Sequence, residues 1–273
     1  MIRVASAPVS YGAFELTVGS LPYVPGPEEV LAAMAEAGYE GTELGPLGYL
    51  GTGATLRRRL GRHGLELVAA FVELRFGDGD LAALSATLEV LDGFDARPVL
   101  CDKGPRDGEV DLGGVARAVE LARARGFEPV FHHHMGTRVQ SAAEIERLLA
   151  STDVALLLDT GHLAAAGGDP VQALRDWRDR LRHVHLKDVR LDALRSALHW
   201  GEAWRSGAFC ELGAGDVDLE TFCADLRRGG YRGWIVVEQD RIPTSEVDAA
   251  EAVAAQARNR RWLRAHAGIG RLG

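Results

Sequence analysis

The sequence alternates between short apolar runs and longer stretches with helical periodicity, and this alternation strongly constrains the fold. Several of the short runs are apolar at both odd and even positions, as expected for parallel strands that are buried on both faces. These runs predict eight strands, over residues 2–7, 39–44, 65–72, 97–101, 128–133, 154–159, 181–186 and 231–238.

The stretches between these runs are amphipathic and predict helices that follow the strands. The last helix begins at Ser245, a good N-cap residue, and has acidic residues in its first turns. We expect helices over residues 27–38, 55–64, 80–93, 113–126 and 245–268. Strict alternation of strands and helices predicts the α/β class and a single (β/α)8 TIM barrel.

One domain over residues 1–273 is expected, because no composition break or Pro/Ser-rich linker divides the chain. The interval between the seventh and eighth strands is longer than the others, since residues 188–217 form an extended loop. We expect a short helix within it, around residues 192–206. In a barrel this loop lies on the C-terminal face, where active sites are built.

Charge and cysteine usage exclude several classes of partner. The 39 acidic and 31 basic side chains give a net charge of −8, so neither nucleic acid nor a membrane surface is expected as a partner. The three cysteines form no C-x-x-C pair, so neither a disulfide framework nor a thiolate zinc site is predicted. Met1 is not followed by a signal-peptide pattern, and we expect a cytoplasmic protein that binds a small molecule.

Polar residues recur where the predicted strands end: Glu43, the histidines at 132–134, Asp159, His185 and Glu238. The carboxyl ends of barrel strands converge on one mouth, so these side chains are expected to face one another. Strand alternation places His132 and His134 on one side and His133 on the other. Imidazole and carboxylate groups from four adjacent strands suit a divalent cation such as Mn²⁺, Mg²⁺, Co²⁺ or Zn²⁺.

Each of these residues also has a structural interpretation. A single histidine near a strand end is more often structural than a ligand, and Asp159 could cap the following helix. Because acidic and imidazole groups recur at the ends of four successive predicted strands, a metal site is favoured over separate structural roles. No G-x-G-x-x-G follows a strand and no G-x-S-x-G occurs, which disfavours dinucleotide binding and serine hydrolysis. A glycosidase pair of Glu43 and Glu238 would leave the imidazoles without a role.

Several segments together resemble the inosose (2-keto-myo-inositol) dehydratases of the xylose-isomerase-like TIM barrel superfamily. The resemblance spans nearly the whole chain, and the order of the HHHMGT, LDTGH, HLKD and VEQD words is specific. The segments are SAPVSYGAFE at 6–15, GYEGTELGPLGYLG at 38–51, FHHHMGTRVQS at 131–141, LLLDTGHLAAAGGDP at 156–170, HVHLKDVR at 183–190 and GYRGWIVVEQD at 230–240.

The resemblance implies a role for individual residues. The implied metal ligands are His132, Asp159, His185 and Glu238, with His134 as the in-phase alternative to His132 at a position where relatives usually carry Glu. Glu43 or Glu238 is the implied base, and His162 or Lys187 the implied acid. The expected substrate contacts are Tyr11, His134 and Arg190. Tyr11 stands where these dehydratases typically have Trp, and LGAGD at 212–216 stands where they have PGDG, so the exact substrate stays open.

The expected function is that of a metal-dependent lyase, with Mn²⁺ or Co²⁺ preferred over Mg²⁺ or Zn²⁺. It would remove water from a cyclic polyhydroxy ketone such as 2-keto-myo-inositol through an enediolate. One alternative is a metal-dependent isomerase or epimerase of a ketose, which returns the proton instead of expelling hydroxide. The other is a sugar-binding subunit of a partner-dependent lyase. A homo-oligomer is compatible with the sequence.

Overall fold

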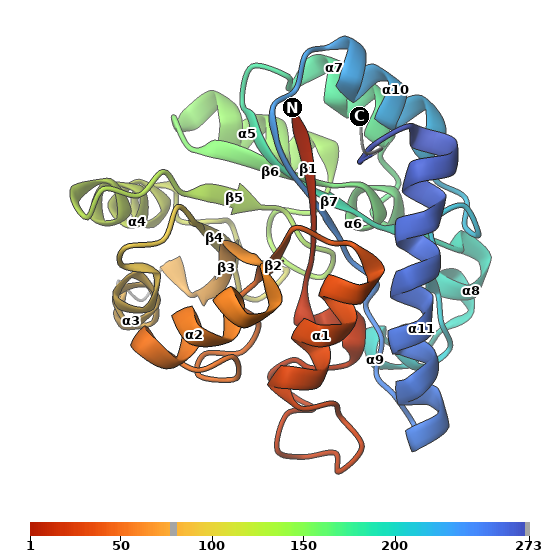
Figure 1. Cartoon of the computed structure of the whole chain (residues 1–273). Helices are drawn as coiled ribbons and strands as arrows, with labels where there is room; N and C mark the ends of the chain where they lie inside the picture. Colours follow the sequence, from red (N-terminus) through yellow and green to blue (C-terminus); the bar gives the residue numbers. More distant parts are fainter. Residues whose placement is uncertain (77–80, 271–273) are drawn as a thin grey trace.

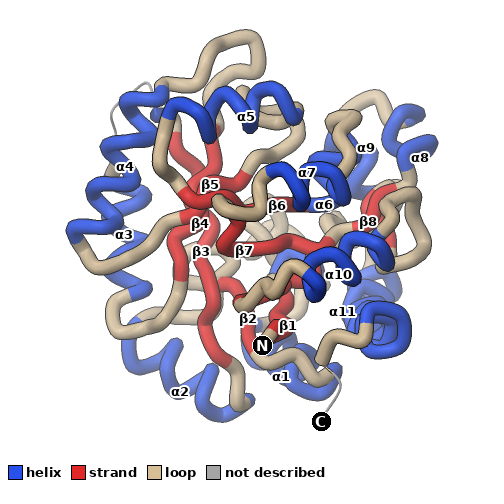
Figure 2. The backbone as a smooth tube through the Cα atoms, turned by 90° about the horizontal axis from the view of Figure 1, so that it is seen from above, coloured by secondary structure: helices blue, strands red, loops and turns tan. Residues whose placement is uncertain are grey.

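A computed structural model of the protein describes residues 1–76 and 81–270, and within them eight parallel strands close into a barrel (Figures 1 and 2). Around the barrel the last strand lies between the first and the seventh, so the first and last strands close it. The strands are β1 (Ile2–Ser6), β2 (Gly41–Glu43), β3 (Glu66–Leu74), β4 (Arg97–Asp102), β5 (Val130–His132), β6 (Ala155–Asp159), β7 (Leu181–Leu186) and β10 (Gly233–Val237). Each overlaps one of the predicted runs, and the predicted (β/α)8 barrel is confirmed.

Helices surround the barrel on the outside (Figure 2). The α-helices outside residues 188–217 are α1 (Pro27–Ala37), α2 (Gly53–His63), α3 (Ala82–Leu91), α4 (Leu112–Ala124), α5 (Ala142–Ser151), α6 (Thr160–Ala165), α7 (Pro170–Asp176), α10 (Leu219–Arg228) and α11 (Glu246–Trp262). The helix predicted over 80–93 corresponds to α3, and residue 80 lies outside the described residues. The helix predicted to reach residue 268 is α-helical only to Trp262, after which a π-helical turn leads to Gly268.

Apolar side chains form two layers. The larger layer lies between strands and helices, and a smaller cluster of buried residues contains Ala5, Val68, Val99, Leu157 and Val236, which come from five strands. The inner positions become polar toward the carboxyl ends of the strands. Along β7, for example, His183 and His185 are both buried and are followed by Lys187. The barrel thus has an apolar base and a polar mouth.

The inserted segment, residues 188–217 between β7 and α10, folds into two short helices and a small sheet. Its elements are β8 (Asp188–Val189), α8 (Leu191–Ser196), α9 (Trp200–Arg205) and β9 (Phe209–Cys210), with β8 and β9 antiparallel. The sequence predicted one helix around 192–206. The helix is interrupted because His199 starts a new one, its Nδ1 accepting the backbone N–H of Glu202 at 3.1 Å.

Asp188 holds this segment in place. Its Oδ1 accepts the backbone N–H groups of Val189 and Val217 at 2.9 and 3.2 Å, and its Oδ2 accepts those of Gly213 and Gly215 at 2.9 and 3.0 Å. A Cβ atom on Gly215 would lie 2.3 Å from Asp188 Oδ1. The glycines of the LGAGD word therefore let the backbone wrap closely around a buried carboxylate.

The loop after β1 meets this segment over the mouth. It contains a 3₁₀ turn over Pro8–Tyr11, and further along it the Phe14 ring contacts the Trp204 ring of α9 edge-on, with 5.2 Å between centroids. Figure 1 shows the first loop, in red, near α9. In the part of the chain that is described, no helix combines the length and the apolar character required to span a bilayer.

Candidate metal centre

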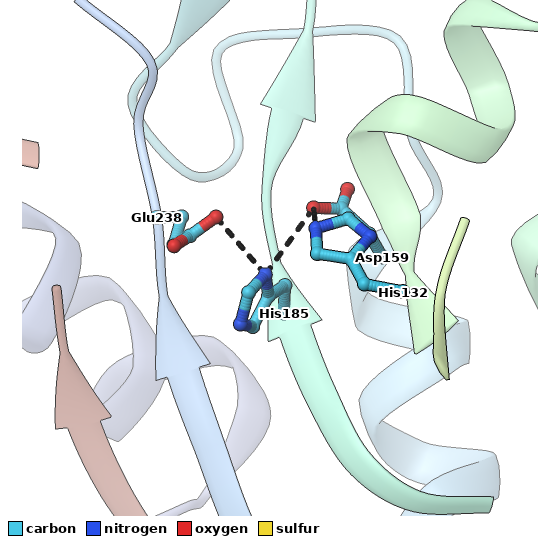
Figure 3. A group of neighbouring side chains, drawn as sticks. All are labelled: His132, Asp159, His185 and Glu238. Carbon is cyan, nitrogen blue, oxygen red and sulfur yellow. Dashed lines mark ion pairs between the residues drawn. The ribbon is translucent and has the colours of Figure 1, made fainter. Parts of the chain in front are cut away.

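Four side chains from neighbouring strands point toward one another at the mouth of the barrel (Figure 3). Asp159 and His185 are register partners on β6 and β7, which brings their side chains together. His185 Nδ1 lies 3.6 Å from Asp159 Oδ2 and 3.0 Å from Glu238 Oε2, and His132 Nε2 lies 3.8 Å from Asp159 Oδ2. Each residue offers one ligand atom, and these atoms lie within 4.8 Å of one another.

The donor set and its surroundings fit a divalent cation. His185 Nδ1 and Asp159 Oδ2 are fully buried, and neither takes part in a well-formed hydrogen bond within the described residues. Burying such groups without a well-formed hydrogen bond is costly, and a cation coordinated by both atoms would offset that cost. His132 Nδ1 hydrogen-bonds the backbone carbonyl of His133, which leaves Nε2 as the ligand atom. Two imidazoles and two carboxylates form a mixed set that divalent metals accept.

Glu43 supports this group from behind. Its Oε1 lies 2.9 Å from His185 Nε2 and 3.1 Å from His183 Nε2, at hydrogen-bond distance from both. A His185 tautomer that donates from Nε2 keeps its Nδ1 lone pair on the side of Asp159 and Glu238. Burial alone would raise the pKa of Glu43, but His185 and His183 outweigh it and hold that pKa below its ordinary value. Glu43 is therefore placed to orient His185, a candidate metal ligand.

Replacing Glu43 with glutamine should weaken divalent metal binding by about 10- to 100-fold, because the carboxylate that orients His185 is lost. Competition with a fluorescent chelator measures this affinity. Glu66→Gln is the matched control, since Glu66 pairs with Arg3 at the opposite end of the barrel. Equal affinities for the Glu43→Gln variant and the wild-type protein would show that Glu43 does not act through His185.

Lys187 lies beside the four-residue group and is almost completely buried. Its Nζ lies 3.0 Å from Glu238 Oε2, 3.2 Å from Asp159 Oδ2 and 2.9 Å from Asp240 Oδ1. Burial alone would lower the pKa of Lys187, but the three carboxylates outweigh it and raise that pKa above its ordinary value. The side chain is therefore an ammonium ion.

A second group of potential ligands lies on the other side of Lys187 and consists of His134, His162 and Asp240, whose donor atoms also lie within 4.8 Å of one another. His162 Nε2 lies 3.0 Å from Lys187 Nζ and 3.4 Å from Asp240 Oδ2. The structure thus separates His132 from His134, which the sequence left as alternatives. His133 points the other way, and its Nε2 accepts the backbone N–H of Asp159 at 3.1 Å, as strand alternation predicted.

A cavity of about 470 Å³ opens above both groups. Its floor is polar and includes Glu43, His132, His134, His162, His185, Lys187, Glu238 and Asp240. Its walls include the apolar side chains of Val9, Phe14, Phe71 and Trp204, and Lys103 and Glu73 pair 2.5 Å apart at its lining. This combination suits a small ring that carries many hydroxyl groups.

Two residues expected to contact the substrate, Tyr11 and Arg190, lie outside the lining of this cavity in the described chain. Tyr11 ends the 3₁₀ turn and is fully buried in the larger apolar layer, between strands and helices. Arg190 is exposed, and it donates to the carbonyls of Ala214 and Gly207 at 3.3 Å. It stabilises the inserted segment instead of facing the cavity.

Asp240 is the site residue that the sequence analysis missed. It belongs to the VEQD word and stands two residues after Glu238, so the alternation of side chains could have placed both carboxylates on the same side. Burial raises the pKa of Asp240; Lys187 opposes this effect while Glu238 and Asp159 add to it, and the result is a pKa of about 6.

Comparisons with known proteins agree with this geometry. A family model described as a xylose isomerase-like TIM barrel matches residues 112–266. The chain is 34% identical over 249 residues to an inosose dehydratase of Geobacillus kaustophilus (strain HTA426), covering 79% of this chain and 80% of that protein. It is 37% identical over 245 residues to the rhizopine catabolism protein MocC of Rhizobium meliloti, covering 79% and 75%. The crystal structure of an IOLI protein with a zinc atom is similar in fold, with a TM-score of 0.70 and 14% identity over 95% of this chain and 96% of that chain.

Proposed function

Because the chain belongs to the xylose isomerase-like TIM barrel family, we propose that it is a metal-dependent dehydratase that removes water from a cyclic polyhydroxy ketone. The observation that carries the proposal is the ring of four buried ligand atoms beside a buried ammonium, at the floor of a cavity sized for one sugar-like ring. The inosose dehydratase of Geobacillus kaustophilus supports 2-keto-myo-inositol as the substrate.

The cation would be held by His132, Asp159, His185 and Glu238. When bound, it supplies Lewis acidity toward a ketone oxygen and a neighbouring hydroxyl group. The zinc atom bound by the IOLI protein, whose fold is similar, supports a divalent cation as the bound group. Within that class we propose Mn²⁺ or Co²⁺, which accept mixed nitrogen and oxygen ligands.

The chain's own residues can move the protons. We assign removal of the α-proton to Glu238, because Oε1 of the competing carboxylate, Glu43, already faces two histidines. The electron pair of the broken C–H bond forms the new double bond as the β-hydroxyl leaves. Lys187 donates a proton to the departing hydroxyl, which becomes water. Glu238 Oε2 lies 3.0 Å from Lys187 Nζ, so the abstracted proton can return to the lysine and restore both groups.

His162 and His134 complete the polar floor. Burial lowers the pKa of His162 well below its ordinary value, and the adjacent His134 lowers it further. His162 is therefore neutral, and its Nε2 lies 3.0 Å from the Lys187 ammonium, where it can accept a hydrogen bond and orient it. His134 lines the cavity and is proposed to contact substrate hydroxyl groups.

A direct assay tests the function. The protein is stripped with a chelator, reloaded with Mn²⁺ or Co²⁺, and incubated with 2-keto-myo-inositol while ultraviolet absorbance and product mass are followed. We expect metal-dependent loss of one water molecule and a new absorbance from the conjugated product. A product of unchanged mass and altered stereochemistry would refute dehydration and identify an epimerase.

Two further proposals concern the cellular compartment and the domain organisation. Cys101, Cys210 and Cys223 are buried and unpaired, which suits a reducing compartment, and we propose the cytoplasm. We also propose that residues 1–273 act as one domain, with residues 188–217 as part of the substrate pocket because Trp204 lines the cavity.

A further inference from the structure

The Lys187 ammonium lies between two sets of metal-type ligands and contacts both. Asp159 and Glu238 belong to the first set, and their Oδ2 and Oε2 atoms lie 3.2 and 3.0 Å from Lys187 Nζ. His162 and Asp240 belong to the second set, at 3.0 and 2.9 Å. In two-metal centres, carboxylates between the ions commonly bridge them at separations of about 3.5–4 Å. Lys187 thus stands where a bridged second cation would stand.

The second set has the features of an incomplete ligand shell. Asp240 Oδ2 is buried and has no well-formed hydrogen bond in the described part of the chain. His134 Nδ1 hydrogen-bonds the carbonyl of Met135 at 2.8 Å, which leaves Nε2 as its free donor atom. Its two imidazoles and one carboxylate are the ligand types of the first set, with one carboxylate fewer.

The chain fixes the position of the lysine. A Cβ atom on Gly161 would lie 2.7, 2.9 and 3.0 Å from Cγ, Cβ and Cδ of Lys187, so only glycine leaves room for this side chain. The Lys187 backbone N–H donates to Thr160 Oγ1 at 2.9 Å, and the same hydroxyl donates to the Lys187 carbonyl at 2.6 Å. Lys103 and Lys187 are the only lysines in a chain otherwise rich in arginine, and both line the cavity. Lysine supplies a compact point charge, which a planar guanidinium does not.

The negative charge buried around the floor of the cavity also requires a cation at the position of the Lys187 ammonium. Four carboxylates, Glu43, Asp159, Glu238 and Asp240, are buried around the floor of the cavity. One divalent ion and one ammonium neutralise three of these four charges. Removing the ammonium would leave a buried excess of negative charge facing His134 and His162, which is costly unless another cation enters.

Resting on the proposed function for the first set, we propose that the Lys187 ammonium takes the place of a second divalent cation. The wild-type centre therefore holds one divalent ion, and His134, His162 and Asp240 are a latent second site that opens when the ammonium is removed.

Metal content tests this inference without an activity assay. Chelated wild-type protein and the Lys187→Ala variant are reloaded with Co²⁺, desalted and analysed for cobalt and protein. We expect about one Co²⁺ per chain in the wild-type protein and about two in the variant, with a second set of cobalt absorption bands. The double variant Lys187→Ala/His162→Ala should return to about one, since it lacks a ligand of the second site. Lys103→Ala is the matched control and should retain about one, as in the wild-type protein.

The measured cobalt content distinguishes failure of the second-site proposal from failure of the proposed metal centre. One Co²⁺ in the folded Lys187→Ala variant, or two in the wild-type protein, would overturn the inference. No retained Co²⁺ in the wild-type protein would refute the proposed metal centre itself. Circular dichroism checks folding, and if the alanine variant does not fold, Lys187→Ser, whose hydroxyl can hydrogen-bond the exposed carboxylates, is measured against the same criteria.

Discussion

Replacing Asp159 with asparagine is expected to abolish metal retention and to lower turnover by at least about 10³-fold, because a metal ion supplies several kcal/mol of charge stabilisation. Asp159 has two separate roles. Its Oδ1 caps α6 by accepting the backbone N–H of His162 at 2.8 Å, while Oδ2 faces the centre. Asparagine caps a helix as well as aspartate does, so the fold should be retained while the ligand charge is lost.

Elemental analysis, circular dichroism and the dehydration assay together measure the effect of this substitution. Asp169→Asn is the matched control, because Asp169 caps α7 through the N–H groups of Val171 and Gln172 but lies outside the cavity lining among the described residues. The control should retain both metal and turnover. A folded Asp159→Asn variant that is fully active without metal would refute the assignment of Asp159 as a ligand.

Replacing Asp188 with alanine should destabilise the protein by about 4 kcal/mol, because several hydrogen bonds to a buried charge are lost and their donors are left unsatisfied. Asp188 is fully buried and accepts four backbone N–H groups from the inserted segment. We expect the midpoint of urea unfolding to fall, and residues 188–217 to become sensitive to limited proteolysis.

The control for this prediction is Asp192→Ala, since Asp192 lies on the exposed side of α8 and pairs with Arg195. Its effect should stay within about 0.5 kcal/mol. Trp204 of the inserted segment lines the cavity, so the Asp188→Ala variant should also lose substrate affinity. A free energy of unfolding within about 1 kcal/mol of wild type would show that the segment holds its conformation without this carboxylate.

The fold was predictable because its signal is repeated along the whole chain. Strands that are buried on both faces must be apolar at successive positions, and only an α/β arrangement places helices between all of them. The prediction was weaker at residues 192–206, where His199 can either continue a helix or cap a new one. The sequence pattern does not distinguish these choices, because both use the same helix-forming neighbours.

The candidate metal ligands were predictable because strand geometry fixes both their height and their direction. His132, Asp159 and His185 lie within strands, where alternation determines which side chains face the mouth. Asp240 was missed because it lies three residues beyond the end of β10, so its direction follows from the sequence only if alternation is extended past the strand. Tyr11 was misplaced for a related reason: a resemblance locates a residue in a loop, but a 3₁₀ turn decides where its side chain points.

The closing pair of strands has a consequence for how the protein matures. Of the eight barrel strands in the described residues, β1 is synthesised first and its partner β10 last, and Glu238 comes directly after β10. The nascent chain can build up neighbouring βα units in order, yet the fourth candidate ligand is synthesised only after all eight of these strands. The four candidate ligands can therefore come together only after the barrel has closed, and we expect stable metal loading to follow synthesis of the eighth barrel strand.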